Sequence, residues 1–201
     1  MSHYYTNNVD LETHETRIPF QYRKHQLTFI SDIDVFSKER VDYGSRVLLD
    51  CMDIQANQRS LLDVGCGYGT LGVSLKKEYP WLHVEMVDVN ERAVHLANQS
   101  CQYNDVEDIK AYLSFAYENV VGTFDVIVSN PPIRAGKKVV FEILEKAFDF
   151  LNENGELIVV IQKKQGAPSA QKKMNEVFGN CEIIKRDKGY FILKSIRNTD
   201  F

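Results

Sequence analysis

No apolar run in this sequence approaches the about 20 residues that are needed to cross a bilayer. The first residues, Met1 to Tyr5, also lack the positive charge and the apolar stretch of a secretory signal peptide. The five histidines form no spaced cluster, and the four cysteines have neither disulfide-type nor zinc-type spacing (Cys51, Cys66, Cys101 and Cys181). We therefore expect a cytoplasmic protein that holds no metal and whose cysteines are small buried thiols.

Length and composition fit one well-packed domain. The chain has 201 residues, 44% of them hydrophobic, which is enough for one core and too little for two. We assign residues 1–44 to an N-terminal extension with a β-hairpin and residues 45–201 to the globular domain. The formal net charge is unevenly spread, because residues 1–130 carry −8 and residues 131–197 carry +5. Such a positive region is typical either of a phosphate-binding face or of an ordinary lysine-rich surface.

The segment from Leu61 to Gly72 has the pattern of a buried strand that runs into a glycine turn and then into a helix. Gly65, Gly67 and Gly69 tolerate positive φ angles and leave room for a ligand to approach the backbone. The helix that follows begins with free N–H groups that point at such a ligand. This segment is therefore the predicted centre of a binding site.

The same turn also satisfies the dinucleotide-binding spacing G-x-G-x-x-G (Gly67, Gly69 and Gly72). Two features favour a different ligand. The turn opens at Gly65, directly after the strand, and Asp63 places a carboxylate there that repels a pyrophosphate and attracts a cation. A second predicted strand ends at Asp88, the position that holds ribose hydroxyls in doubly wound nucleotide-binding folds.

The remaining chain alternates between strand and helix patterns. Strands are predicted at residues 61–64, 84–88, 111–114, 124–129 and 157–161, the last one buried on both faces. The intervening helices include one capped by Ser45, one capped by Asn90 and one with Leu151 on its inner face. Hairpins are predicted at residues 18–31 and 182–194. This order predicts an α/β, doubly wound, mostly parallel sheet that ends in an antiparallel hairpin.

Asn130, Pro131 and Pro132 follow the predicted strand 124–129, at the edge where open α/β sheets bind their ligands. The two prolines make the backbone rigid. The side-chain oxygen of Asn130 and a backbone carbonyl can accept both hydrogens of an exocyclic amino group, and can aim its lone pair at the group to be transferred. Alone, the tripeptide is equally typical of a turn. Together with the glycine turn and Asp88, it indicates a catalytic loop.

These three signals together resemble class I S-adenosylmethionine-dependent methyltransferases that modify amino groups. Residues 34–37, 42–45, 88–93 and 130–137 narrow the resemblance to the "methyltransferase small domain" group, over roughly residues 3–196. This group includes bacterial small-subunit ribosomal RNA guanine-N2 methyltransferases, and the chain is similar to its single-domain, stand-alone members. The resemblance implies a Rossmann-like fold with a seven-stranded sheet, S-adenosylmethionine as the cofactor, and ribosomal RNA or the small ribosomal subunit as the partner.

The resemblance also implies roles for individual residues. The predicted cofactor-binding residues are Asp63, Gly65, Gly67, Asp88, Ser114 and Asn130, and the predicted catalytic residues are Asn130, Pro131 and Pro132. The predicted substrate-binding residues are Ile133, which stands where the family usually has an aromatic residue, and the basic Arg134, Lys137, Lys138, Lys163 and Lys164. Phe36 either closes over the cofactor or belongs to the core. Ordinary surface positions are assigned to Lys172, Lys173, Lys185, Arg186 and Lys188.

Three alternatives remain open at this point. The acceptor could be adenine N6, a protein glutamine amide or a small molecule, because each uses the same loop chemistry. A protein that binds S-adenosylmethionine and RNA without catalysis would keep Asp63 and Asp88 and tolerate the loss of Asn130. An NAD-dependent oxidoreductase would be recognised by its binding of NAD in place of S-adenosylhomocysteine.

Overall fold

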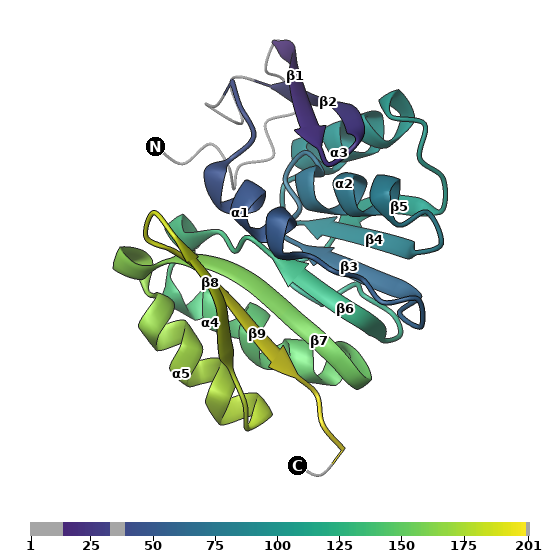
Figure 1. Ribbon diagram of the computed structural model, residues 1–201. Helices are drawn as coiled ribbons and strands as arrows, with labels where there is room; N and C mark the ends of the chain where they lie inside the picture. Colours follow the sequence, from purple (N-terminus) through teal and green to yellow (C-terminus); the bar gives the residue numbers. More distant parts are fainter. Residues whose placement is uncertain (1–13, 33–38, 200–201) are drawn as a thin grey trace.

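The computed structural model describes residues 14–32 and 39–199, and Figure 1 shows their arrangement. An antiparallel hairpin is formed by β1 (Glu15–Tyr22) and β2 (His25–Asp32). The elements that follow are α1 (Tyr43–Cys51), β3 (Ser60–Val64), α2 (Thr70–Glu78), β4 (His83–Asp88), α3 (Glu91–Tyr103), β5 (Ile109–Leu113), β6 (Phe124–Ser129), η1 (Ile133–Ala135), α4 (Lys137–Lys146), η2 (Ala147–Phe150), β7 (Leu151–Gln162), η3 (Lys163–Gln165), α5 (Ala167–Phe178), β8 (Glu182–Asp187) and β9 (Tyr190–Ile196).

Strands β3 to β9 form one seven-stranded sheet in the order β5-β4-β3-β6-β7-β9-β8. The pairs β3 with β4, β3 with β6, β4 with β5 and β6 with β7 are parallel, whereas β9 runs antiparallel to β7 and β8. The predicted fold, with its C-terminal hairpin and its N-terminal hairpin, is confirmed. Because parallel strands end at the same edge, the residues that follow β3, β4 and β6 lie side by side.

Helices cover both faces of the sheet (Figure 1). On one face α1, α2 and α3 pack with the N-terminal hairpin around a core that includes Leu48, Leu75 and Leu96. On the other face α4 and α5 bury a second core, in which Leu144 and Met174 are fully enclosed. Strand β7 lies between these layers, and the predicted two-sided burial of residues 157–161 is confirmed.

The N-terminal hairpin is fixed to α3 by side chains that replace a neighbouring strand. The backbone N–H of Thr28 donates to Asn104 Oδ1 (2.9 Å), and the N–H of Ile30 donates to Ser100 Oγ (3.0 Å). Asn104 returns a hydrogen bond from Nδ2 to the carbonyl of Thr28 (2.8 Å). These bonds satisfy backbone groups of β2 that the two-stranded sheet leaves unpaired.

Two predicted element boundaries are wrong. The pattern predicts Ser45 as the cap of α1, but the helix begins at Tyr43 and Asp42 is the cap, accepting from the Ser45 N–H (3.3 Å). The pattern also places Leu151 on a helix, but Leu151 begins β7, and its burial is compatible with either element. The predicted cap Asn90 is confirmed, because its side chain accepts from the backbone of α3. Phe36 and the segment 34–37 lie outside the described residues.

Candidate active site

The glycine turn connects β3 to α2 and is held against β4. The N–H groups of Gly65 and Cys66 both donate to the carbonyl of Val87 (2.8 and 2.9 Å). Gly65, Gly67 and Gly69 all have positive φ angles, which side chains with a Cβ rarely adopt. A Cβ at Gly65 would lie 3.6 Å from the ring of Pro132, so the turn and the Asn-Pro-Pro loop are neighbours.

Asp63 is buried directly beneath this turn. Its Oδ2 accepts from the N–H of Gly72 (3.0 Å), whereas its Oδ1 is buried and has no hydrogen-bond partner among the described residues. Burial raises the pKa of this carboxyl to about 7, the charge of Asp88 raises it further, and the Gly72 N–H opposes the shift. A buried carboxylate with an unused oxygen is a site prepared for a hydrogen-bonding cation.

Gly72 allows this arrangement by having no side chain. A Cβ at this position would lie 2.5 Å from Met86 Sδ and 3.4 Å from Asp63 Oδ2. The absence of the side chain lets α2 pack closely on β4 and brings its N–H within reach of Asp63.

Asp88 ends β4 and is 3% exposed. Its Oδ2 accepts from the N–H of Gly67 (2.9 Å) and its Oδ1 accepts from the N–H of Asn90 (3.0 Å). The carboxylate therefore joins the glycine turn to the start of α3. Each carboxylate oxygen has a further lone pair, so the predicted role toward ribose hydroxyls is compatible with this structural role.

Ser114 has a different environment from the one that the sequence suggests. Its buried hydroxyl donates to the carbonyl of Ala116 (2.9 Å) and accepts from the N–H of Asn119 (3.0 Å). The side chain thus stabilises the turn after β5. The neighbouring Leu113 and Phe115 are 38% and 40% exposed, and they present an apolar surface at the end of β5 in its place.

The Asn-Pro-Pro loop begins where β6 ends. Ser129 Oγ donates to the carbonyl of Val64 (2.6 Å), which ties the loop to the end of β3. The Asn130 carboxamide donates from Nδ2 to Asp42 Oδ2 (2.9 Å) and to Ser45 Oγ (3.0 Å). Sequence reasoning overlooked both partners, because they lie 88 and 85 residues away in the chain.

Beyond this loop the chain forms a short 3-10 turn. The carbonyl of Pro132 accepts from the N–H of Ala135 (2.9 Å), and the carbonyls of Asn130 and Pro131 precede this turn. Pro131 is buried, Pro132 is half-buried, and Ile133 is half-buried against the second core. Ile133 is therefore partly a packing residue, and its predicted contact with a substrate remains a prediction.

Basic side chains surround the same edge of the sheet. Those predicted from the sequence are exposed and follow β6 (Arg134, Lys137 and Lys138) or β7 (Lys163 and Lys164). Lys188 joins them, because β9 is antiparallel and the turn before it returns to this edge, where the N–H of Lys163 donates to the Gly189 carbonyl (2.8 Å). We call these six residues the basic rim. The assignment of Lys188 to ordinary surface is thus corrected by the topology.

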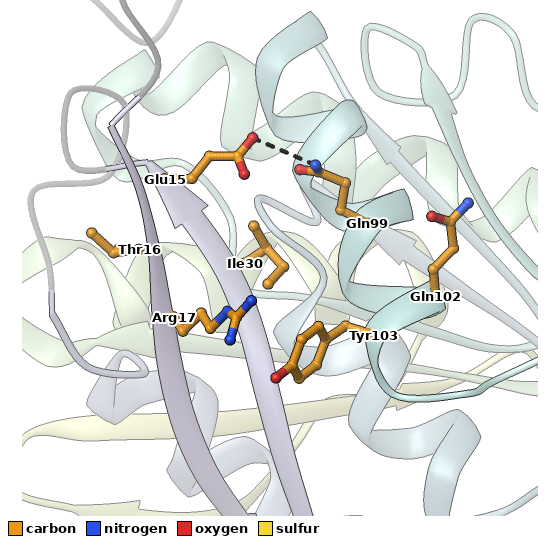
Figure 2. A pocket seen from close by; sticks show the side chains of 7 residues that line it. All are labelled: Glu15, Thr16, Arg17, Ile30, Gln99, Gln102 and Tyr103. Atoms are coloured by element: carbon orange, nitrogen blue, oxygen red, sulfur yellow. Dashed lines mark hydrogen bonds between the residues drawn. The ribbon is translucent and has the colours of Figure 1, made fainter.

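A hollow of about 540 Å³ lies elsewhere, between the N-terminal hairpin and α3 (Figure 2). Figure 2 shows the guanidinium of Arg17 beside the ring of Tyr103, 5.1 Å from its centroid, and the amide of Gln99 donating to Glu15 Oε1 (3.4 Å). The residues that line this hollow come from β1, β2 and α3. It is therefore separate from the edge formed by the glycine turn and the Asn-Pro-Pro loop.

A family model described as "Methyltransferase small domain" matches residues 26–194. The chain belongs to this family. The match covers the glycine turn, the Asn-Pro-Pro loop and the basic rim, so the geometry above is that of a methyltransferase domain. The oxidoreductase alternative is thereby set aside.

Individual relatives differ in how much of their length this chain covers. The uncharacterized protein YbxB of Bacillus subtilis is 45% identical over 195 residues, 96% of this chain and 97% of that protein. Ribosomal RNA small subunit methyltransferase C of Aeromonas hydrophila is 38% identical over 139 residues, 67% of this chain and 40% of that protein. The chain thus spans less than half of this named relative.

The solved structures give the same fold. The 16S rRNA N2 methyltransferase RsmC of T. thermophilus, in complex with AdoMet and guanosine, superposes with a TM-score of 0.83 at 22% identity. The comparison covers 94% of this chain and 52% of that chain. A methyltransferase from Pyrococcus furiosus matches with a TM-score of 0.65. These likenesses confirm the Rossmann-like methyltransferase fold.

S-adenosylmethionine is the cofactor of this methyltransferase domain. The residues at the edge fit it, because Asp63 offers a buried acceptor to an ammonium group and the glycines leave room for a nucleoside against the backbone. Among residues 14–32 and 39–199 there is no group of three or more side chains suited to hold a metal ion. The four cysteines are free thiols, and none of the described helices is long and apolar enough to cross a membrane.

The pKa of Asp63 predicts a pH-dependent affinity for S-adenosylmethionine. A cationic ligand favours the ionised carboxylate, so below a pKa of about 7 binding must release a proton. We expect the affinity to rise roughly fivefold to tenfold between about pH 6 and about pH 7.5. Isothermal titration calorimetry in buffers of different ionisation enthalpy would measure both the affinity and the proton release.

The variant Asp63→Asn is the control. It should bind weakly and with a flat pH profile, whereas a wild-type profile that is flat over this range would contradict the assignment. A carboxyl whose folded-state pKa is raised stabilises the fold at low pH and loses that contribution as the pH rises toward about 7. Ligand-free Asp63→Asn should therefore melt at or above the wild-type temperature at about pH 8, which separates lost binding from lost folding.

Proposed function

We propose that this chain transfers a methyl group from S-adenosylmethionine to an exocyclic amino group of RNA, with guanine N2 of ribosomal RNA as the target. The observation that carries the proposal is the carboxamide of Asn130, whose nitrogen is bound by Asp42 and Ser45. This leaves Oδ1 as an acceptor beside the glycine turn. Relatives that are named as ribosomal RNA methyltransferases support the choice of substrate.

The Asn-Pro-Pro loop supplies the catalytic groups. When bound, S-adenosylmethionine supplies a methyl group activated by its sulfonium. Asn130 Oδ1 and a backbone carbonyl of the loop accept the two amino hydrogens, which turns the nitrogen lone pair toward the methyl group. Alignment of this kind contributes about 7–11 kcal/mol to lowering the barrier. The two acceptors also stabilise the positive charge that grows on nitrogen as the C–S bond breaks and the N–C bond forms.

No strong general base is needed for this reaction. The newly methylated nitrogen carries a positive charge and is acidic enough to lose its proton to water. Asp63 and Asp88 are buried beneath the turn, on the cofactor side, and act there in binding. The loop therefore has a positioning and electrostatic role, which matches its rigid proline backbone.

The basic rim suits an RNA substrate. Its lysines and Arg134 are exposed around the edge at which the target base must enter, and exposed cations of this kind raise affinity without reading sequence. The target amino group can reach Asn130 when its base is unpaired or flipped out of a helix.

The direct test is methyl transfer from radiolabelled S-adenosylmethionine to small ribosomal subunits or ribosomal RNA from cells that lack this protein, followed by digestion to nucleosides. We expect label in N2-methylguanosine. Asn130→Ala should lower the rate constant by about a hundredfold or more, because it removes an acceptor that acts in the transition state. Asn152→Ala, which removes an amide bound to Asp125 far from the loop, should retain activity.

Each other outcome has a distinct meaning. Label in N6-methyladenosine would keep the mechanism and change the base. Label in protein or in a small molecule would remove RNA from the proposal. Tight binding of the cofactor without transfer to any of these acceptors would point to a protein that binds S-adenosylmethionine without catalysis.

The basic rim predicts the salt dependence of RNA binding. Replacing Lys163, Lys164 and Lys188 by alanine should reduce the slope of log affinity against log salt by about two units, since each phosphate contact contributes about 0.7–0.9. Fluorescence anisotropy with a ribosomal RNA fragment would measure this slope. A matched variant with Lys24, Lys146 and Lys172 replaced carries the same charge change at exposed positions away from the edge. Equal slopes for both variants would contradict the role of the rim.

A further inference from the structure

The partners of Asn130 determine which end of its carboxamide faces the substrate. Nδ2 donates to Asp42 Oδ2 (2.9 Å) and to Ser45 Oγ (3.0 Å). The oxygen and nitrogen of an amide are nearly equal in shape, so its orientation follows from the chemistry of its neighbours. An ionised carboxylate has acceptors and no donors, and it therefore binds the NH2 end. Oδ1 is the end that remains for the substrate.

We propose that Asp42 is a positioning residue that sets the polarity of the active site: it holds the amide nitrogen of Asn130 so that the substrate meets an acceptor. The proposal rests on the proposed function and deepens it. It restricts the methylated group to one that donates hydrogen bonds, such as an amino or amide N–H. A deprotonated hydroxyl or an unprotonated ring nitrogen would meet Oδ1 as acceptor against acceptor and be rejected.

Asp42 can impose this orientation because its own position is fixed by α1. As the cap of the helix it accepts from the Ser45 N–H through Oδ2 (3.3 Å), and its carbonyl accepts from the Arg46 N–H (3.1 Å). Gly44 lets the helix start pack against the C-terminal hairpin, since a Cβ there would lie 2.9 Å from the ring of Tyr190. The carboxylate is thus held between the helix backbone and the catalytic loop.

The tyrosine at the first position of α1 adds a second attachment. The hydroxyl of Tyr43 donates to Asp187 Oδ2 (3.0 Å) at the end of β8, and its ring lies 5.6 Å from that of Tyr190. These contacts fix the helix end on which Asp42 stands. Side chains that are locked in this way hold a catalytic group to the narrow tolerance that it needs.

The charge of Asp42 also acts through the amide. A carboxylate hydrogen-bonded to the NH2 end polarises the carboxamide and increases the negative charge on Oδ1, because linked hydrogen bonds strengthen one another. The oxygen then stabilises more strongly the positive charge that grows on the substrate nitrogen. Ser45 holds the same nitrogen with a neutral oxygen and should contribute less.

The experiment compares Asp42→Asn, Ser45→Ala and Asn130→Ala with the double variant Asp42→Asn/Asn130→Ala under single-turnover conditions. Asparagine caps helices as well as aspartate does, so Asp42→Asn retains the start of α1. We expect it to lower the rate constant about tenfold to a hundredfold, with the KM for S-adenosylmethionine unchanged, because the amide introduced by Asp42→Asn can donate as well as accept and no longer selects one orientation. Ser45→Ala should lose less.

The double variant separates positioning from a general structural effect. If Asp42 acts through Asn130, then Asp42→Asn should change the rate of the Asn130→Ala protein by less than about twofold. An equal loss in both backgrounds would overturn the proposal, and so would wild-type activity of Asp42→Asn.

A reciprocal exchange gives a gain of activity. Asn130→Asp alone should be nearly inactive, because two carboxylates would then face each other. Adding Asp42→Asn restores a donor behind residue 130 and leaves one of its oxygens for the substrate, so the pair Asp42→Asn/Asn130→Asp should recover at least about tenfold. No recovery would count against the polarity argument.

A spectroscopic readout separates this proposal from the proposed function. The side-chain NH2 signals of Asn130, assigned by their absence in Asn130→Ala, should be shifted and protected from exchange in the wild type and should lose both properties in Asp42→Ala. This holds whatever the substrate is. Unperturbed signals in the wild type would overturn the positioning role, whereas a failure to methylate RNA with perturbed signals would reject the RNA substrate alone.

Discussion

Two backbone N–H groups converge on the carboxylate of Asp88, and the shape of the cofactor side depends on them. One comes from Gly67 in the glycine turn and the other from Asn90 at the start of α3. The carboxylate thereby fixes a turn that has positive φ angles and a helix end that has free N–H groups. Removing this charge would release both elements at once, so the acid at the end of β4 has a structural role as well as a binding role.

A second acid, Asp63, lies beneath the same turn, and burying two carboxylates close together is unfavourable. Asp88 offsets its burial with hydrogen bonds to both oxygens, whereas Asp63 keeps one oxygen unpaired. The unfavourable energy is therefore concentrated at the atom that faces the ligand. A cation that binds there removes a repulsion as well as forming a new contact, which favours a charged donor such as S-adenosylmethionine over its neutral analogues.

Sequence patterns predict the sheet and the glycine turn because these depend on local signals. Gly65 after a buried strand, the Asn90 cap and the fully apolar run at 157–161 each need no knowledge of the rest of the chain. The partners of Asn130 were beyond this reasoning, since Asp42 reaches it through the packing of α1 on the C-terminal hairpin. Lys188 was missed for a related reason: its place at the active edge follows from the antiparallel direction of β9. Ser114 shows the opposite case, in which a polar residue at a strand end serves its own turn.

The central pairing of the sheet has a consequence for how the domain folds. Strand β3 pairs with β6 through partners such as Leu61 and Val126, between which β4, β5 and two helices must be threaded. The catalytic edge therefore has no local precursor: the glycine turn and the Asn-Pro-Pro loop meet after a long loop closure whose entropy is repaid late. Folding of this domain should be slow for its size, and a chain still lacking β6 would expose the apolar face of β3 to other strands.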